Sequence, residues 1–265
     1  MKAKFLLPLA AVFLMAGCAQ VPPDAGSNPE DPYESFNRQM FYVNDQLDRK
    51  VLKPVTTGYR WLVPEYARDR VSDALSNLSE PTTAANSFLQ GKGGDGVTSV
   101  FRFLVNSTFG IAGIFDVAEM IGMPKKPEDF GQTLGVWGVG EGSYLVLPLL
   151  GPSGTRDMFR YPFAVATDAG TYLLHNEDWY AAVALAGVAA VDMRSEMMDK
   201  GLDDMRGNIL DEYVAVRDAY RQQRRHEIAD GNVSEEETLE TLTPLSFDDY
   251  EDEDDEDADK GGLKE

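Results

Sequence analysis

The chain has 265 residues, a formal net charge of −21 at pH 7 and a single cysteine. This acidic composition excludes nucleic-acid binding through a basic surface, because a phosphate backbone requires clustered lysine and arginine side chains. A single cysteine also excludes an internal disulfide.

The first seventeen residues are predicted to be a secretory signal peptide. Lys2 and Lys4 form a short basic region, and residues 5–16 form an apolar region too short to remain as a membrane anchor. Residues 15–18 (Met-Ala-Gly-Cys) form a lipobox, in which small residues precede a cysteine that receives acyl chains. We therefore expect covalent N-terminal acyl and diacylglycerol groups on Cys18, which supply more than the two signals that stable anchoring requires.

The residues after the cysteine indicate where the lipoprotein resides. Ala19 follows Cys18, whereas Asp at this position usually retains bacterial lipoproteins at the inner membrane. The outer membrane is therefore favoured. Residues 18–30 are polar and contain prolines, and they are predicted to form a lipidated tether.

Residues 31–230 are predicted to form one domain made mainly of α-helices. The first helix should begin near Asp31 or Pro32. Its apolar side chains recur at the spacing of an amphipathic helix, and we expect this stripe to face the core or a membrane. The stripe consists of Phe36, Met40, Val43 and Leu47.

Further helices follow along the chain. Val71, Leu75 and Leu78 repeat the amphipathic spacing, and Pro81 is predicted to end that helix because proline lacks a backbone N–H. Helices are also predicted at residues 96–109, 111–121 and 178–198. A long final helix is marked by Ile209, Tyr213, Val216 and Tyr220, and it ends in a basic cluster of Arg221, Arg224 and Arg225.

Strand evidence is limited to one short segment. Tyr144–Leu147 is apolar and is followed by Pro148, which should end a strand. The longest apolar run of the predicted domain is about eleven residues, whereas a spanning helix needs roughly twenty. Any immersion in a membrane must therefore be shallow or use amphipathic helices that lie in the interface.

The centre of the chain, residues 130–157, is rich in glycine among apolar and aromatic residues. Such spacing lets backbone pass close to backbone or to a ligand. The glycines are Gly131, Gly135, Gly138, Gly140, Gly142, Gly151 and Gly154.

This segment fits no catalytic or metal-binding motif. Its glycines lack the spacing of a dinucleotide-binding loop. Neither Ser143 nor Ser153 lies in the Gly-x-Ser-x-Gly motif of a serine hydrolase. His175 and His226 are the only histidines, and no cluster has the ligand spacing of a metal site. We predict no catalytic residue, no metal site and no cofactor.

The last residues, 231–265, are predicted to be a disordered acidic tail. Fifteen acidic residues and two lysines lie between Ser234 and Glu265. This segment lacks the apolar content that would offset the entropy of ordering it.

Four segments in order resemble the MlaA (VacJ) lipoprotein family of Gram-negative outer membranes. Together they cover most of residues 31–225. They are residues 31–38 (DPYESFNR), residues 102–118 from Arg-Phe-Leu-Val-Asn-Ser-Thr-Phe-Gly to Gly-Ile-Phe-Asp-Val-Ala, residues 130–157 from Phe-Gly-Gln-Thr-Leu-Gly to Gly-Thr-Arg-Asp, and residues 213–220 (YVAVRDAY).

The resemblance implies a ring-like helical body in the inner leaflet of the outer membrane, on its periplasmic side, around an amphipathic channel. It implies that the protein removes phospholipid from the outer leaflet and passes it to a periplasmic carrier of the MlaC type. It further implies association with trimeric porins and no enzymatic activity.

Within this framework, part of the glycine-rich segment is hypothesised to line the lipid channel, and the aromatic residues within it would suit a water–lipid boundary. The alternative is that these residues form close-packed turns without lipid contact. The candidate residues are Gly131, Gly135, Trp137, Gly138, Gly140, Gly142 and Tyr144. Arg102, Arg156 and Asp157 are either head-group ligands or partners in ordinary salt bridges.

Two other functions are compatible with parts of the sequence. A structural lipoprotein could scaffold porins or the envelope without moving lipid. A phospholipase would require an activated nucleophile, and no such arrangement is visible.

Overall fold

The computed structural model describes residues 21–23, 25, 26, 28, 31–174, 179–203 and 210–232. This part of the chain is mainly helical, as predicted, and carries one two-stranded β-hairpin. The predicted signal peptide, Cys18, His175, Ile209 and the acidic residues after 232 lie outside the described residues. The predictions made for them stay predictions.

Helix α2 (Glu34–Leu47) is the first predicted amphipathic helix, and Asn37, Met40 and Val43 are its buried residues. It continues through a π-helical turn (Asp48–Leu52) into α3 (Lys53–Leu62). The turn precedes Pro54, whose missing N–H interrupts the regular hydrogen-bond ladder.

Helix α4 (Glu65–Leu89) corrects the prediction that Pro81 ends a helix, because the helix continues for eight residues beyond it. The buried residues of α4 lie mainly from Asn77 onward, where the helix packs against α5 (Gly93–Thr108). Tertiary packing on both sides of the proline outweighs the single backbone hydrogen bond that it removes.

Residues 111–121 are not one helix, contrary to prediction. Ile111, Ala112 and Gly113 have positive φ angles, and only α6 (Val117–Met120) is helical. A Cβ on Gly113 would lie 2.6 Å from Cβ of Asn77 in α4, so glycine is required where this turn meets α4.

The glycine-rich segment contains α7 (Phe130–Val136) and the hairpin of β1 (Tyr144–Leu147) and β2 (Gly151–Gly154). Strand β1 was predicted, whereas β2 was not, because its sequence Gly-Pro-Ser-Gly has low strand propensity. The strands are antiparallel, with Val146 opposite Pro152.

The remaining elements are a 3₁₀ turn (Asp157–Phe159), α8 (Arg160–Thr167), α9 (Ala169–Leu173), α10 (Trp179–Asp199) and α12 (Glu212–Ile228). The last two agree with the helices predicted at 178–198 and near the end of the domain. None of the helices in the described residues is long and apolar enough to cross a membrane.

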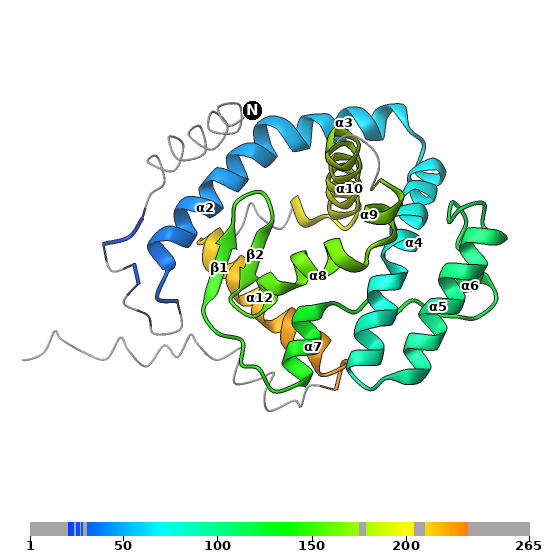
Figure 1. Ribbon diagram of the computed structural model, residues 1–265. Helices are drawn as coiled ribbons and strands as arrows, with labels where there is room; N and C mark the ends of the chain where they lie inside the picture. Colours follow the sequence, from blue (N-terminus) through cyan, green and yellow to red (C-terminus); the bar gives the residue numbers. More distant parts are fainter. Residues whose placement is uncertain are drawn as a thin grey trace, which may run out of the picture.

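The elements contact one another in a closed circuit, in agreement with the predicted ring-like body. Helices α2, α3 and α4 form an arc around α8, α9 and α10 (Figure 1). The circuit continues from α4 to α7, from α7 to α12, from α12 to β2, and from β1 back to α2. Segments from both ends of the domain thus meet at the hairpin.

The apolar core is small and lies where α2, the hairpin and α12 meet. Its buried members are Met40, Val43, Tyr144, Val146 and Tyr213. The rings of Tyr144 and Tyr213 pack edge to face with centroids 6.1 Å apart.

Candidate functional site

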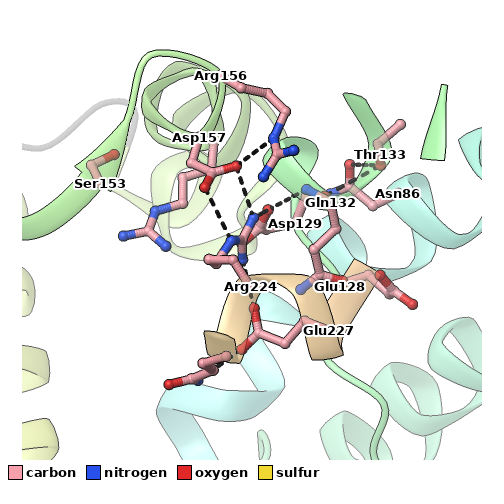
Figure 2. A network of polar contacts seen from close by, with 12 residues as sticks. Asn86, Glu128, Asp129, Gln132, Thr133, Ser153, Arg156, Asp157, Arg224 and Glu227 are labelled. Atoms are coloured by element: carbon pink, nitrogen blue, oxygen red, sulfur yellow. Dashed lines mark hydrogen bonds and ion pairs between the residues drawn. The ribbon is translucent and has the colours of Figure 1, made fainter. Parts of the chain in front are cut away.

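The glycine-rich segment is held in place by a buried network of charged side chains (Figure 2). Arg224 of α12 donates through Nη1 to Asp129 Oδ2 at 2.7 Å and through Nη2 to Asp129 Oδ1 at 2.9 Å. Arg224 also contacts Asp157 Oδ2 at 3.3 Å, and Arg156 Nε donates to Asp157 Oδ1 at 2.8 Å. The two ends of the segment, Asp129 and Asp157, are therefore joined through one helix.

The network also fixes the start of α7. Asp129 Oδ1 accepts from Gln132 N at 2.9 Å and caps the helix. Thr133 donates through Oγ1 to Asn86 Oδ1 of α4 at 2.9 Å. Gln90 of α4 donates to Glu128 Oε2 at 2.8 Å. Helix α7 is thus held between α4 and α12.

The electrostatics stabilise the charged forms of the network. Burial by itself raises the pKa of Asp157, but Arg156 and Arg224 outweigh burial and hold this pKa below 3.8. Burial by itself lowers the pKa of Arg224, but the carboxylates of Asp129 and Asp157 outweigh it and raise this pKa. Removing one partner would leave an uncompensated buried charge.

Gly131 and Gly135 permit close packing and do not provide open space. A Cβ on Gly131 would lie 2.7 Å from both Arg224 Nη2 and Asp157 Oδ1. A Cβ on Gly135 would lie 2.8 Å from Ile228 Cδ1. These two glycines let α7 approach α12, which is the close-packed alternative of the sequence analysis.

The last residue of α7 and the loop that follows it, residues 136–140, are exposed and mostly apolar or glycine. Trp137 is 54% exposed, and Val136 and Val139 are also exposed. The Trp137 ring is nevertheless fixed, because its Nε1 donates to Leu89 O at 2.9 Å and its edge packs on Phe130. A held tryptophan on an exposed apolar loop suits a water–lipid boundary.

The other predicted channel residues also fall into two groups, those that are exposed and those that pack within the fold. Gly138 and Gly140 are exposed and have open space around them. Gly142 has φ +69° and would place a Cβ 2.0 Å from Thr155 Oγ1, so it serves the turn. Tyr144 is 1% exposed and belongs to the core, where burial raises its pKa. Its placement at a water–lipid boundary is therefore corrected.

A second buried polar cluster joins the beginning and end of the domain. Asp31 accepts hydrogen bonds from Asn37 Nδ2 at 2.9 Å and from the hydroxyl of Tyr213. Asn37 also donates to Tyr144 O at 3.0 Å and accepts from Val146 N at 2.9 Å. The segments 31–38 and 213–220 are thus joined through the hairpin.

A third cluster surrounds Arg102, whose side chain is 1% exposed. Arg102 Nε lies 2.7 Å from Glu80 Oε1, and Nη2 lies 2.6 Å from Asp116 Oδ2. Arg102, Arg156 and Asp157 therefore form salt bridges within the fold, the second of the two predicted roles.

Two residues considered for a hydrolytic site, Ser153 and His226, lie within the described residues. Ser153 is fully buried, and its Oγ is 3.5 Å from Gly154 O. His226 is exposed on α12. The described residues contain no group of three or more His, Cys, Asp or Glu side chains arranged to hold a metal ion.

Exposed apolar side chains surround these polar clusters. The junction of α3 and α4 exposes Trp61, Leu62 and Tyr66. Other groups lie on α5 and the turn after it, on α8 to α10, and at the hairpin tip. They include Val100, Phe101, Leu104, Phe109, Ile111, Leu149, Leu150, Val165, Tyr172, Leu173, Tyr180 and Val183. Exposed apolar side chains in such number indicate contact with a membrane or a partner.

Sequence reasoning missed the residues that organise this site, namely Asp129, Gln132, Thr133 and Glu227. They occupy polar positions with no catalytic pattern. Only the fold brings Asp129 to Arg224 and Thr133 to Asn86, whereas Glu227 lies one turn after Arg224 on the same helix. The available signal was the repeated pairing of Asp with Arg at positions 156–157 and 217–218.

A family model described as "MlaA lipoprotein" matches residues 29–227. A protein of Escherichia coli (strain K12), named intermembrane phospholipid transport system lipoprotein MlaA, is 35% identical over 224 residues, which is 82% of this chain and 85% of that protein. A protein of Rickettsia felis is 38% identical over 195 residues, 73% of this chain and 76% of its own.

A solved structure reported as "Structural basis for maintenance of bacterial outer membrane lipid asymmetry" is similar over 75% of this chain and 98% of its own. Its TM-score is 0.66, with 34% sequence identity.

Proposed function

This chain belongs to the MlaA lipoprotein family, and we propose that it extracts mislocalised phospholipids from the outer leaflet of the outer membrane. The lipid passes through an amphipathic channel to a soluble periplasmic carrier of the MlaC type. This retrograde transport between membranes maintains the lipid asymmetry of the outer membrane. The protein itself is not an enzyme in this proposal.

The proposal rests on one observation. The distribution of polar and apolar side chains between interior and surface is the reverse of that in a water-soluble domain. Among the described residues the fully buried large side chains are mostly polar, whereas tryptophan, leucine and phenylalanine side chains are exposed on many elements. A water-soluble domain normally buries such residues. A body with a hydrogen-bonded polar interior and an apolar exterior is suited to lie in a leaflet without spanning the bilayer.

Anchoring and partners complete the proposal. Lipid groups on Cys18 hold the protein on the periplasmic side of the outer membrane, and no cofactor is needed because moving a lipid breaks no covalent bond. Trimeric porins are the proposed membrane partners, since exposed apolar faces on several elements leave room for both lipid and protein contacts.

The test is the amount of phospholipid in the outer leaflet of intact cells, measured with an impermeant amine-reactive or phospholipase probe. Cells that lack the gene should accumulate surface phospholipid, and the wild-type gene should reverse this. Cys18→Ala should fail to reverse it, because the acylated thiol is absent. Met15→Leu, which gives a more usual lipobox, is the matched control and should restore wild-type levels.

Unchanged surface phospholipid in the deletion strain would contradict transport and leave a porin or envelope scaffold as the function. Full restoration by Cys18→Ala would contradict the proposed anchor while leaving transport in place. The level of the protein in the envelope, measured in each strain, separates loss of function from loss of protein.

A further inference from the structure

A polar cavity of about 310 Å³ lies between the first half of α4 and the last half of α10. Small-molecule sites span roughly 300–1,000 Å³, so this cavity suits a small polar group. Five carboxylates and two guanidinium groups line it, with the serines at positions 72 and 195. A molecule bound in this cavity must therefore carry both a positive and a negative group to pair with its lining.

Asp192 is the buried carboxylate of this cavity, and it forms no ion pair with the described residues. It is 6% exposed, and both of its oxygens accept from Ser72 Oγ at 2.9 Å. No lysine or arginine nitrogen of the described residues lies within 4.0 Å of it. By contrast, Asp199 lies 2.6 Å from Arg60, and Asp73 lies 3.0 Å from Arg70.

The direction of the pKa shift of Asp192 agrees with this geometry. Burial raises the pKa of Asp192 and Glu196 adds to this, and together they outweigh the opposing effects of the Ser72 hydrogen bond and of Arg68. A buried carboxylate without a cation is costly unless a positive group pairs with it. An ammonium group that enters the cavity would supply that charge.

The arginines provide hydrogen-bond donors on the α4 side of the cavity. Arg70 Nη1 is paired with Asp73, whereas its Nε is buried and has no acceptor. Arg68 contacts Val63 O at 3.3 Å and Asp199 at 3.4 Å, both long for charged hydrogen bonds. Guanidinium groups with unused donors are well suited to phosphate oxygens.

Exposed apolar side chains lie on the helices that form this cavity and at the corner before α4. Trp61, Leu62 and Tyr66 are exposed at the corner that leads into this part of α4, and Trp61 is 84% exposed. On α10, Met193 and Met197 follow Asp192 and Glu196 directly and are exposed. A charged cavity and exposed apolar residues on the same helices correspond to the two parts of a lipid.

We propose that this cavity binds the head group of a phosphatidylethanolamine-type phospholipid. Arg68 and Arg70 contact the phosphate, Asp192 accepts hydrogen bonds from the primary ammonium, and the acyl chains follow the exposed apolar residues. The inference rests on the proposed transport function and specifies its substrate class.

The charges of the cavity favour this head group over others. An anionic glycerol head group would face an excess of three negative charges and bring no cation to Asp192. A quaternary ammonium has no N–H to donate to a carboxylate. A metal ion is a poorer occupant, because the described residues contain no group arranged to hold one.

The test uses the full-length lipidated protein in detergent, incubated with vesicles that contain equal parts of phosphatidylethanolamine, phosphatidylglycerol and phosphatidylcholine. Bound lipid is then quantified by mass spectrometry after repurification. We expect wild type to be enriched in phosphatidylethanolamine over phosphatidylglycerol. Asp192→Asn, which keeps an acceptor for Ser72, should lower that enrichment roughly tenfold, the size of one hydrogen bond to a charged group.

The matched control is Glu119→Gln, which removes one negative charge from an exposed position on α6 and should leave the ratio unchanged. Arg70→Gln should reduce the total lipid bound without reversing the preference. Helix content by circular dichroism identifies any variant that fails to fold, and the wild-type ratio tests the inference without any variant.

The outcomes separate this inference from the proposed function. Absence of bound phospholipid in wild type would overturn both. Bound lipid without preference for the ethanolamine head group, or an equal ratio in folded Asp192→Asn and Glu119→Gln, would overturn the cavity assignment and leave transport intact. Binding of soluble phosphoethanolamine with no lipid bound would identify a small-molecule site instead.

Discussion

At the scale of single residues, most buried side chains are polar, and many of them form specific hydrogen bonds. Asp31, Asn37 and Asp157 are fully buried and hydrogen-bonded. Such groups are costly when unpaired, so the clusters that contain them tolerate change poorly. Glycines that pack against these clusters are constrained as well, because an added side chain would displace the paired groups.

Gly131→Ala should destabilise the fold by about 1–3 kcal/mol, the typical cost of inserting a methyl group into a packed site. The new Cβ would lie 2.7 Å from Arg224 Nη2 and Asp157 Oδ1. Denaturant unfolding of the protein in detergent measures the loss. Gly140→Ala, with open space around it, is the control and should stay within about 0.5 kcal/mol. Equal effects of the two changes would contradict the packing argument.

Asp157 should contribute to the dependence of stability on pH. Its folded pKa lies below the ordinary value of 3.8, so the unfolded chain binds a proton first as pH falls. The stabilisation is present above about pH 4 and is lost as pH falls through the folded pKa. The stability difference between wild type and Asp157→Asn should therefore shrink below about pH 4. Unfolding curves at several pH values test this, and a constant difference would contradict it.

Elements are joined at their ends by side chains that bond to backbone. Asn37 and Asn44 both extend from α2 to the hairpin. Asn44 donates to Leu147 O at 2.9 Å and accepts from Leu149 N at 2.8 Å. Two asparagines two turns apart thus fix the hairpin along the length of α2.

Asn37→Ala should destabilise the protein by about 2–4 kcal/mol, because it removes three buried hydrogen bonds, to Asp31, Tyr144 O and Val146 N. Asn44→Ala should cost about 1 kcal/mol, since water can reach its partners at the exposed end of the hairpin. Thermal unfolding followed by circular dichroism compares the two. A larger loss of stability for Asn44→Ala would show that burial of the hydrogen-bond partners does not determine the loss.

Several elements were predictable from local pattern, and others were not. The periodicity of Phe36, Met40 and Val43 and the apolar run of β1 predicted α2 and the strand. The passage of α4 through Pro81 depends on packing against α5, which no local rule contains. The turn at Ile111 and Ala112 likewise requires positive φ angles that these residue types rarely adopt.

The whole molecule combines a polar interior, an apolar exterior and an acidic C-terminal segment. The charge of that segment is far from neutral, whereas the domain before it has a moderate charge. A segment so poor in apolar residues cannot contribute to a packed core. Its removal therefore tests whether the domain is independent of it.

Deletion of residues 234–265 should leave the domain folded. The melting temperature should be unchanged, and helical signal should be kept for the domain, because the deleted residues offer little apolar surface to bury. Circular dichroism of the truncated and full-length lipoproteins checks this. A large loss of helicity or melting temperature would show that the acidic segment stabilises the domain.

The sequence alone determined the helical class, the family resemblance, the predicted lipid anchor and the absence of a motif for a spanning helix, because these depend on local composition, periodicity and ordered motifs. Tertiary structure alone decided the roles of Tyr144 and Gly131, which lie in the core and against Arg224. It also brought Asp192 to the cavity beside Arg68 and Arg70. Burial and charge pairing between residues distant in the chain arise from packing, and packing is not encoded in any single segment.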